Sequence, residues 1–440
     1  MTRNRAFGVA ASAALLLALF VVLPGVGADE KEREKREGLY RPLGLFTEVL
    51  SLVRANYVEP VESKPLLAGA FAGMTEAMDP FSEYIPPDRM AAFTAYQASK
   101  QKELPELGLV LAKRFGYPVV VAPVAGSPAA AAGLKSDDLI EKIDGLHAHG
   151  LALWEVEAKL AGKPGRRVSL LVVRDGKPRR RTLEIVAGSW TPRAPSASRV
   201  EGETVVAIPS FAPGTAREVA AILAPFDRTK PLVLDLRNNA WGSYDEAART
   251  AALFVPAGPL GELSGRKVET RLFRSEPGER VHDSRLVLLV DSGTAGPAEL
   301  FAAAVKEALD KTPPKADEKK AKFERDVDGT IERLDEETEA PDGNGKPMTW
   351  NGKMVRLVGE PSMGMAFTQQ VVKMQSGGAL LVSVGKVRTL SGRALSPKGL
   401  SPDDRVYHVP PDESVNQSPV DPFLERAVKV LAEGRPKAVA

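Results

Sequence analysis

Cysteine is absent from the 440 residues, and histidine occurs only four times. Without cysteine the chain can form no disulfides, thiolate zinc sites or cysteine nucleophiles. No two histidines are spaced as His-x-x-x-His, so we expect no metal site, and we expect no cofactor. The formal net charge is only +2, which gives no electrostatic reason to expect nucleic acid as a partner.

Long apolar runs are also scarce, and the one that stands out lies at the N-terminus. Arg3 and Arg5 precede an apolar stretch from Ala6 to Leu23, which is followed by Val26-Gly27-Ala28 and two acidic residues. A basic start, an apolar stretch and a small-residue end are typical of a secretory signal. About 18 residues is also borderline for an uncleaved membrane anchor. With either reading of residues 1–28 we expect an exported protein, periplasmic or in the cell envelope, either secreted or anchored.

The remaining chain divides by pattern into helical, strand-rich and alternating parts. Phe46, Val49, Leu50 and Val53 have the i, i+3, i+4, i+7 spacing of an amphipathic helix. From residue 201 onward, short buried-strand candidates are each followed by a helical pattern, which favours an α/β core. We therefore predict a multidomain α/β protein. Its parts are a charged spacer at 29–44, a helical region at 45–103, a strand-rich domain at 104–187, a linker at 188–200, the core at 201–410 with a polar insertion at 310–350, and a tail helix at 411–440.

Several motifs, in the same order along the chain, resemble those of the carboxyl-terminal processing (tail-specific) serine proteases. The resemblance covers roughly residues 45–410. The matching segments are Met78-Asp79-Pro80-Phe81-Ser82, Glu106-Leu107-Gly108-Leu109, Gly126-Ser127-Pro128-Ala129, Asp138-Leu139-Ile140 with Ile143-Asp144-Gly145, Leu234-Asp235-Leu236-Arg237-Asn238-Asn239, Gly359-Glu360-Pro361 and Gly399-Leu400-Ser401-Pro402-Asp403.

The resemblance implies a fold and a binding function. It implies a ClpP/crotonase-like core at 201–410 and an inserted PDZ domain at 104–187. Leu107, Gly108 and Leu109 would then form the loop whose backbone N–H groups bind a peptide's terminal carboxylate, while the adjoining strand edge pairs with the peptide. The expected partners are protein or peptide C-termini.

The catalytic pattern of the family is not retained. Its members use a serine nucleophile, placed within S-A-S-A-S-E, and a neutral lysine as general base. Aligned on Glu299-Leu300-Phe301, the nucleophile position is Gly296, which has no side chain. The lysine position in G-E-x-T-x-G-K-G is Met365, whose thioether is not a useful base. The glutamine four residues further on is retained as Gln369.

The positions that should stabilise the oxyanion are altered as well. One backbone donor should come from the residue after the nucleophile, which is Pro297 and has no N–H. The other should come from a glycine pair, which reads Trp241-Gly242 here. Loss of one such donor typically lowers the rate about 100- to 1000-fold.

These substitutions predict a non-catalytic binder of C-termini or a regulator of proteolysis, with an active protease paralogue as a possible partner. Two alternatives stay open. An active serine-type endopeptidase would need a displaced site, for which Ser292, Thr294 and Lys306 are the candidates. A structural envelope protein would be favoured if the PDZ groove were blocked.

Overall fold

The computed structural model describes residues 26–99, 107–161, 164–174, 180–310, 354–407 and 421–433. Most of the predicted signal or anchor and nearly all of the predicted insertion at 310–350 lie outside these ranges. The chain divides into two compact units, Met1–Gly73 and Met74–Ala440. They are described separately below.

The described part of the first unit is helical. Helix α2 (Val26–Asn56) runs through the predicted spacer at 29–44 and is followed by α3 (Ser63–Glu76), whose last residues belong to the second unit. Leu45, Val49 and Leu52 of α2 are at least half exposed. None of the helices in the described ranges is long and apolar enough to span a bilayer.

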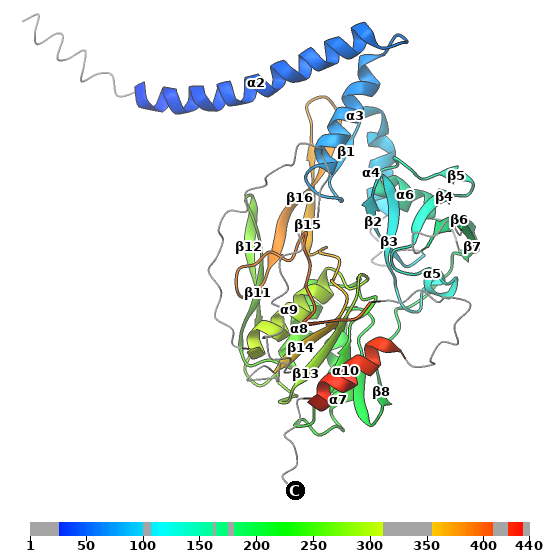
Figure 1. The fold of residues 1–440 in the computed structure, drawn as a ribbon, viewed down its shortest axis with the longest axis vertical. Helices are drawn as coiled ribbons and strands as arrows, with labels where there is room; N and C mark the ends of the chain where they lie inside the picture. Colours follow the sequence, from blue (N-terminus) through cyan, green and yellow to red (C-terminus); the bar gives the residue numbers. More distant parts are fainter. Residues whose placement is uncertain are drawn as a thin grey trace, which may run out of the picture. The chain divides into compact units, whose positions relative to one another are not determined.

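The centre of the second unit is a six-stranded sheet in the order β17-β14-β13-β10-β9-β8 (Figure 1). Five of its strands are parallel, and β8 runs antiparallel to β9. The strands are β8 (Ser196–Val200), β9 (Glu203–Ala207), β10 (Leu232–Asp235), β13 (Leu286–Val290), β14 (Val355–Gly359) and β17 (Asp404–Arg405).

Both faces of this sheet are covered, which explains why its strands are continuous apolar runs rather than alternating ones. In β10, Leu232 and Leu234 pack into one core cluster, whereas Val233 between them packs into another. The first cluster includes residues of α7 (Thr215–Leu223), α8 (Tyr244–Ala252) and α9 (Pro297–Asp310). The second includes residues of α10 (Pro422–Glu433). The α/β core predicted from the alternating pattern is confirmed.

A second, antiparallel sheet packs on the outer side of α8 and α9. Its order is β1-β16-β11-β12, with β15 also paired to β16. Leu260, Phe273 and Val387 from this sheet join the core cluster that contains α8 and α9. Its strands are β1 (Glu83–Ile85), β11 (Gly258–Gly265), β12 (Val268–Ser275), β15 (Phe367–Lys373) and β16 (Ala379–Arg388).

The third sheet lies in the predicted PDZ segment and has its own apolar core. Its order is β2-β3-β4-β6-β7, with β5 paired to β4. Ile140, Val156 and Leu170 are among its fully buried residues. Its elements are β2 (Leu109–Arg114), β3 (Tyr117–Pro123), α5 (Pro128–Ala131), β4 (Leu139–Ile143), β5 (Leu146–His147), α6 (Leu153–Leu160), β6 (Arg167–Val173) and β7 (Arg180–Val186).

Three predicted boundaries differ from the structure. The linker at 188–200 ends in strand β8, whose residues are mostly exposed and polar and therefore carry no apolar signal. The helical region at 45–103 contains strand β1 between α3 and the helices η1 (Pro87–Arg89) and α4 (Met90–Ser99). Within the part of the predicted tail helix (411–440) that the structure describes, α10 begins at Pro422 and covers one face of the core sheet.

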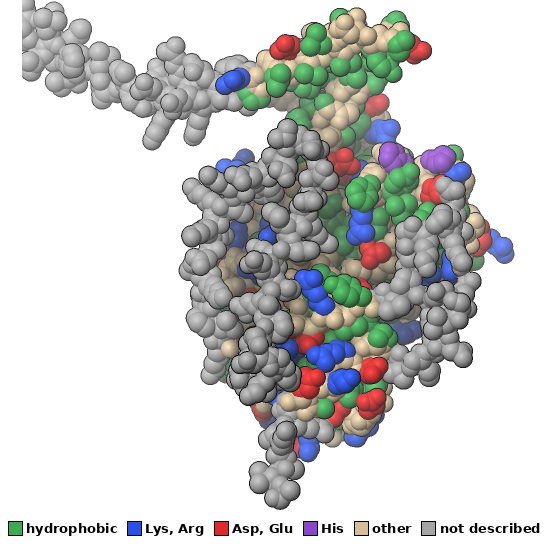
Figure 2. Space-filling model, viewed as in Figure 1, with side chains coloured by type: hydrophobic (Ala, Val, Ile, Leu, Met, Phe, Trp, Pro, Cys, Tyr) green, Lys and Arg blue, Asp and Glu red, His purple; other side chains and the backbone are tan. Residues whose placement is uncertain are grey.

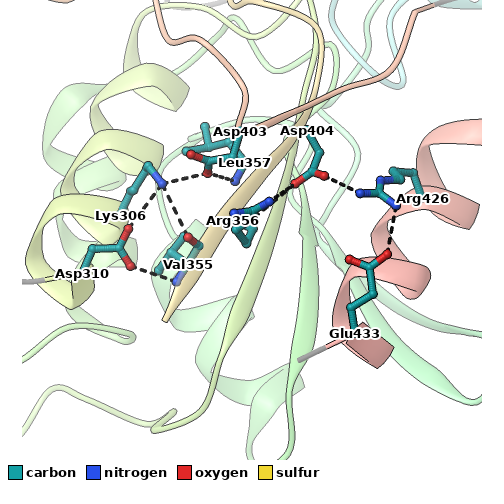
Figure 3. Close-up of polar contacts among 9 residues, drawn as sticks. All are labelled: Lys306, Asp310, Val355, Arg356, Leu357, Asp403, Asp404, Arg426 and Glu433. Carbon is teal, nitrogen blue, oxygen red and sulfur yellow. Dashed lines mark hydrogen bonds and ion pairs between the residues drawn. The ribbon is translucent and has the colours of Figure 1, made fainter. Parts of the chain in front are cut away.

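A group of polar contacts, here called the clamp, joins the end of α9, where the insertion begins, to the start of β14, where it ends. Asp310 at the end of α9 accepts hydrogen bonds from the backbone N–H groups of Met354 and Val355, at 3.0 and 3.1 Å. Lys306 donates to Asp403 at 2.7 Å and also pairs with Asp310 (Figure 3). The same figure shows Asp404 bridging Arg356 of β14 and Arg426 of α10. The clamp thus joins the described residues on the two sides of the insertion to each other.

We predict that residues 312–352 can be replaced by a short Gly-Ser linker with a change in melting temperature of only a few degrees. The expected reason is that the clamp, and not the insertion, holds α9 beside β14. By contrast, Asp310→Ala in the full chain should lower stability by about 2 kcal/mol, because two backbone donors lose their acceptor. Thermal unfolding of both variants measures this. A large loss of stability in the deletion variant would show that the insertion packs on the core.

Candidate functional site

The predicted nucleophile and base positions lie together at the start of α9. Gly296 directly precedes the helix and has a φ of +56°. A Cβ placed on Gly296 would lie 3.6 Å from the carbonyl oxygen of Met365 and 3.9 Å from the hydroxyl oxygen of Tyr244. That hydroxyl donates to the carbonyl of Phe367 at 3.1 Å. The place where a serine and a lysine would meet is therefore formed by glycine and methionine, without a nucleophile or a free amine.

Glu299 fixes these two positions relative to each other. Its Oε2 accepts hydrogen bonds from the backbone N–H groups of Gly296 and Met365, both at 2.9 Å. Its Oε1 accepts from Ser362 Oγ at 2.5 Å and from the backbone N–H of Gly364 at 2.6 Å. Glu299 is fully buried, and this burial raises its pKa to about 7 although all four hydrogen bonds act to lower it.

In the altered oxyanion region, the structure explains why proline is tolerated at position 297 and why glycine is kept at position 242. Pro297 is the buried first residue of α9, where its missing N–H and fixed φ are tolerated. Gly242 pairs with Phe211, and a Cβ on Gly242 would lie 2.2 Å from the Phe211 carbonyl oxygen. Trp241, which is half-buried, accepts a hydrogen bond from Phe211 through its carbonyl. Glycine is thus required at 242 by the close approach of two backbones.

The side chain of Gln369, the residue retained from the family pattern, has a structural partner. It lies in β15 and donates from Nε2 to the carbonyl of Phe81 at 2.7 Å. The ring of Phe81 packs against that of Phe367 with centroids 4.6 Å apart. Gln369 therefore holds the segment before β1 against the antiparallel sheet.

The candidates for a displaced catalytic site are engaged elsewhere. Ser292 donates to Asp137 at 2.6 Å. Thr294 is buried and donates to the carbonyl of Leu236 and to Asp291, both at 3.0 Å. Lys306 lies in the clamp near the far end of α9. Within the described ranges, the structure brings neither hydroxyl to this lysine.

The predicted PDZ domain packs directly on the degenerate site. Ser136 donates to Asn238 Oδ1 at 2.7 Å, at the loop that follows β10. The apolar cluster of the PDZ domain continues into the core through Ala295, and Met363 and Met365 pack against this cluster. The position where the family has a lysine is therefore part of an apolar interface.

The backbone of Leu107 and Gly108 is oriented as a carboxylate site requires. Their carbonyls accept hydrogen bonds from Ala129 and Val124, at 3.0 and 2.8 Å. In a trans peptide, the N–H of the next residue points away from the carbonyl. The N–H groups of Gly108 and Leu109 therefore point to the opposite side. Gly108 has a φ of +69° and a Cβ there would lie 2.1 Å from Ser127 Cβ, so only glycine fits.

Strand β2 and helix α6 lie where the walls of the predicted peptide groove would be. β2 is an edge strand, and no described strand pairs with its outer edge. Leu109 and Leu111 of β2 share an apolar cluster with Val156 and Leu160 of α6. An extended peptide could pair with the free edge of β2 and insert an apolar side chain between β2 and α6.

No group of three or more acidic or histidine side chains in the described residues is arranged to hold a metal ion. On the face shown in Figure 2, basic and acidic side chains are interspersed rather than gathered by sign.

Comparison with known proteins agrees with this architecture. Residues 204–310 match the sequence model of peptidase family S41, and residues 119–174 match that of the PDZ domain. The chain carries an S41 peptidase domain and a PDZ domain. The resemblance to carboxyl-terminal processing proteases is thereby confirmed.

The relatives and a solved structure point to the same group of proteins. The chain is 24% identical to the carboxy-terminal-processing protease of Bartonella bacilliformis, over 86% of this chain and 78% of the relative. It is 24% identical to the carboxy-terminal processing protease CtpA of Bacillus subtilis, over 80% and 66%. It is 26% identical to a probable CtpA-like serine protease of Staphylococcus aureus, over 67% and 59%. The fold is similar to that of a photosystem II D1 C-terminal processing protease, with a TM-score of 0.56, 22% identity and coverage of 80% and 84%.

We predict that the stability of the protein falls as the pH rises from 6.5 to 8. The pKa values of Glu299 and Glu83 are both raised from 4.5 to about 7 by burial, so the native state keeps protons that the unfolded state has released. Each group should remove about 1 kcal/mol over this window. His282, whose pKa burial lowers to about 4, contributes a slope of the opposite sign that ends near 6.5. Urea unfolding at several pH values measures the slope.

The variant Glu299→Gln should have a smaller slope and should also be less stable at every pH. The N–H group of the glutamine amide would face N–H and O–H groups that now donate hydrogen bonds to Glu299. This mismatch should lower the stability by roughly 1–3 kcal/mol. Glu218→Gln on the exposed side of α7 is the matched control and should keep the slope. A wild-type slope in Glu299→Gln would show that Glu299 titrates normally in the native protein.

Proposed function

We propose that this protein is a non-catalytic member of the carboxyl-terminal processing group that captures protein C-termini through its PDZ domain. The observation that carries the proposal is the pairing of Gly296 with Met365 at the site where the relatives' chemistry would be expected. Neither residue has a side chain that can attack a peptide or accept its proton.

Two further observations support loss of cleavage rather than relocation. The hydroxyls nearest to Gly296 in sequence, on Ser292 and Thr294, donate to carboxylates and a carbonyl. The methionine at position 365 packs on apolar residues, an environment that disfavours a charged amine. The protein would then act as a scaffold, as a regulator of an active paralogue or as a subunit that presents substrates. We place it outside the cytoplasm on the basis of the N-terminal sequence pattern.

The binding half of the proposal makes a direct prediction. Peptides with an apolar last residue and a free carboxylate should bind in the roughly micromolar range, which corresponds to about −8 kcal/mol. Amidation of the terminus should weaken binding, because the N–H groups of Gly108 and Leu109 would lose a charged acceptor. Gly108→Ala should weaken it further, since its Cβ clashes with Ser127. Isothermal titration distinguishes these cases. Equal binding of free and amidated peptides would contradict the carboxylate site.

The catalytic half predicts that restoring only the two missing side chains is insufficient. Gly296→Ser combined with Met365→Lys should fold with some loss of stability, because a Cβ at 296 meets no atom within 3.5 Å but the φ of +56° is strained for serine. It should nevertheless show negligible peptidase activity and no labelling by a fluorophosphonate, because Pro297 still lacks the donor for the oxyanion. Addition of Pro297→Ala and Trp241→Gly should be needed for turnover. Labelling of the wild-type chain, or digestion of a tailed peptide by the double variant, would overturn this assignment of the site.

A further inference from the structure

Helix α6, which would form one wall of the peptide groove, has only half of a side-chain cap of its own: Glu155 accepts a hydrogen bond from the backbone N–H of Ala152 at 3.0 Å, but the N-cap side chain accepts none from the first turn. Its N-cap residue is Ala152, which has no side chain able to accept a hydrogen bond from the first turn. Alanine is among the poorest residues at this position. The unpaired N–H groups of the first turn must therefore be satisfied by another part of the structure.

The missing acceptor comes from the antiparallel sheet of the core. Glu83 is the first residue of β1, which pairs with β16. Its Oε1 accepts a hydrogen bond from the backbone N–H of Leu153, the first residue of α6, and the N–H of Trp154 also bonds to the carboxylate. The carboxylate thus caps a helix that lies 70 residues further along the chain.

The surroundings of Glu83 make this cap sensitive to a proton. The residue is only 4% exposed, and its Oε2 is buried without a hydrogen-bond partner. The charged and titratable groups that face it are Lys113 on β2, Glu157 on α6 and Tyr96 on α4. Burial outweighs the other influences and raises the pKa of Glu83 to about 7.

Further contacts join the segment around β1 to the same helix. Arg89 pairs with Glu155, and the hydroxyl of Tyr96 donates to Glu157. The rings of Phe93 and Trp154 pack edge to face, with centroids 5.4 Å apart. These contacts keep α6 near the core when the cap weakens, so loss of the cap loosens the first turn of α6 rather than releasing the helix.

We propose that Glu83 is a positioning residue for the peptide groove: by losing or gaining one proton it strengthens or weakens the cap that holds α6 beside β2. The ionised carboxylate places negative charge at the positive end of the helix, which is the stabilising arrangement. When only the first turn of α6 loosens, Glu83 stays buried and loses just the backbone hydrogen bonds, which act to lower its pKa. Ionisation of Glu83 therefore opposes this local opening, although it favours global unfolding, in which the carboxylate becomes hydrated. The first turn of α6 is then held more firmly above neutral pH than below it. The effect on peptide affinity rests on the proposed function, whereas the effect on the helix does not.

The first test uses the protein without peptide. Hydrogen exchange of the α6 amides, corrected for the intrinsic effect of pH, should show about fivefold more protection at pH 8 than at pH 6. In Glu83→Gln the protection should be low at both pH values. Glu184→Gln on β7, an exposed carboxylate in the same domain, is the matched control and should behave like the wild type.

A compensating variant separates a cap from a merely structural role. Ala152→Ser supplies α6 with its own cap. In the Glu83→Gln background it should restore protection, and the restored protection should be the same at pH 6 and pH 8. Protection that is independent of pH in the wild type, or unchanged in Glu83→Gln, would overturn the proposal.

The second test is peptide binding to the same variants. An apolar-ended peptide with a free carboxylate should bind about fivefold more weakly at pH 6 than at pH 8 in the wild type, and with little pH dependence in Glu83→Gln. A pH dependence that survives in Glu83→Gln would assign the titrating group elsewhere and would reject Glu83 as the switch. If no peptide binds at either pH while α6 protection responds as expected, the cap stands and the proposed function fails.

Discussion

A single buried carboxylate organises the centre of this protein. Glu299 receives three backbone N–H groups and one hydroxyl, and these come from the start of α9 and from the Ser362–Met365 loop. Because each donor would be costly to leave unsatisfied, the two loops cannot separate while α9 is intact. The geometry that brings Gly296 to Met365 therefore persists even though neither residue can perform catalysis.

The same arrangement places the loop around Met365 against the PDZ domain. Met363 and Met365 contact an apolar cluster that continues into the PDZ domain. A lysine at 365 would have to remain neutral there, whereas methionine packs without a desolvation penalty. Methionine at position 365 thus favours close contact between the two domains.

The sequence predicted the core well where the signal is local and strong. The strands around Val233 and Val287 are buried on both faces, so their apolar runs indicated buried strands, and their alternation with helical patterns indicated an α/β core. Positions within dense motifs, such as Gly108, could be assigned because the backbone there tolerates only glycine. Strand β8 was missed because an exposed edge strand needs few apolar residues. The capping role of Glu83 could not be predicted for another reason. Its partner Leu153 is remote in sequence, and no local sequence pattern indicates a helix cap that comes from another domain.

Helix α10 has a consequence for how the chain can mature. Asp421 caps this helix through Phe423, and Arg237 connects it to the core by pairing with Asp421 and lying over the Phe423 ring. Yet α10 is the last helix in the described residues, so one face of the parallel sheet stays uncovered until residues 422–433 have been synthesised. A nascent chain therefore cannot complete this core early. A product truncated before residue 421 would expose Val233, Val287 and their neighbours, and such an apolar sheet face promotes aggregation and removal by proteases.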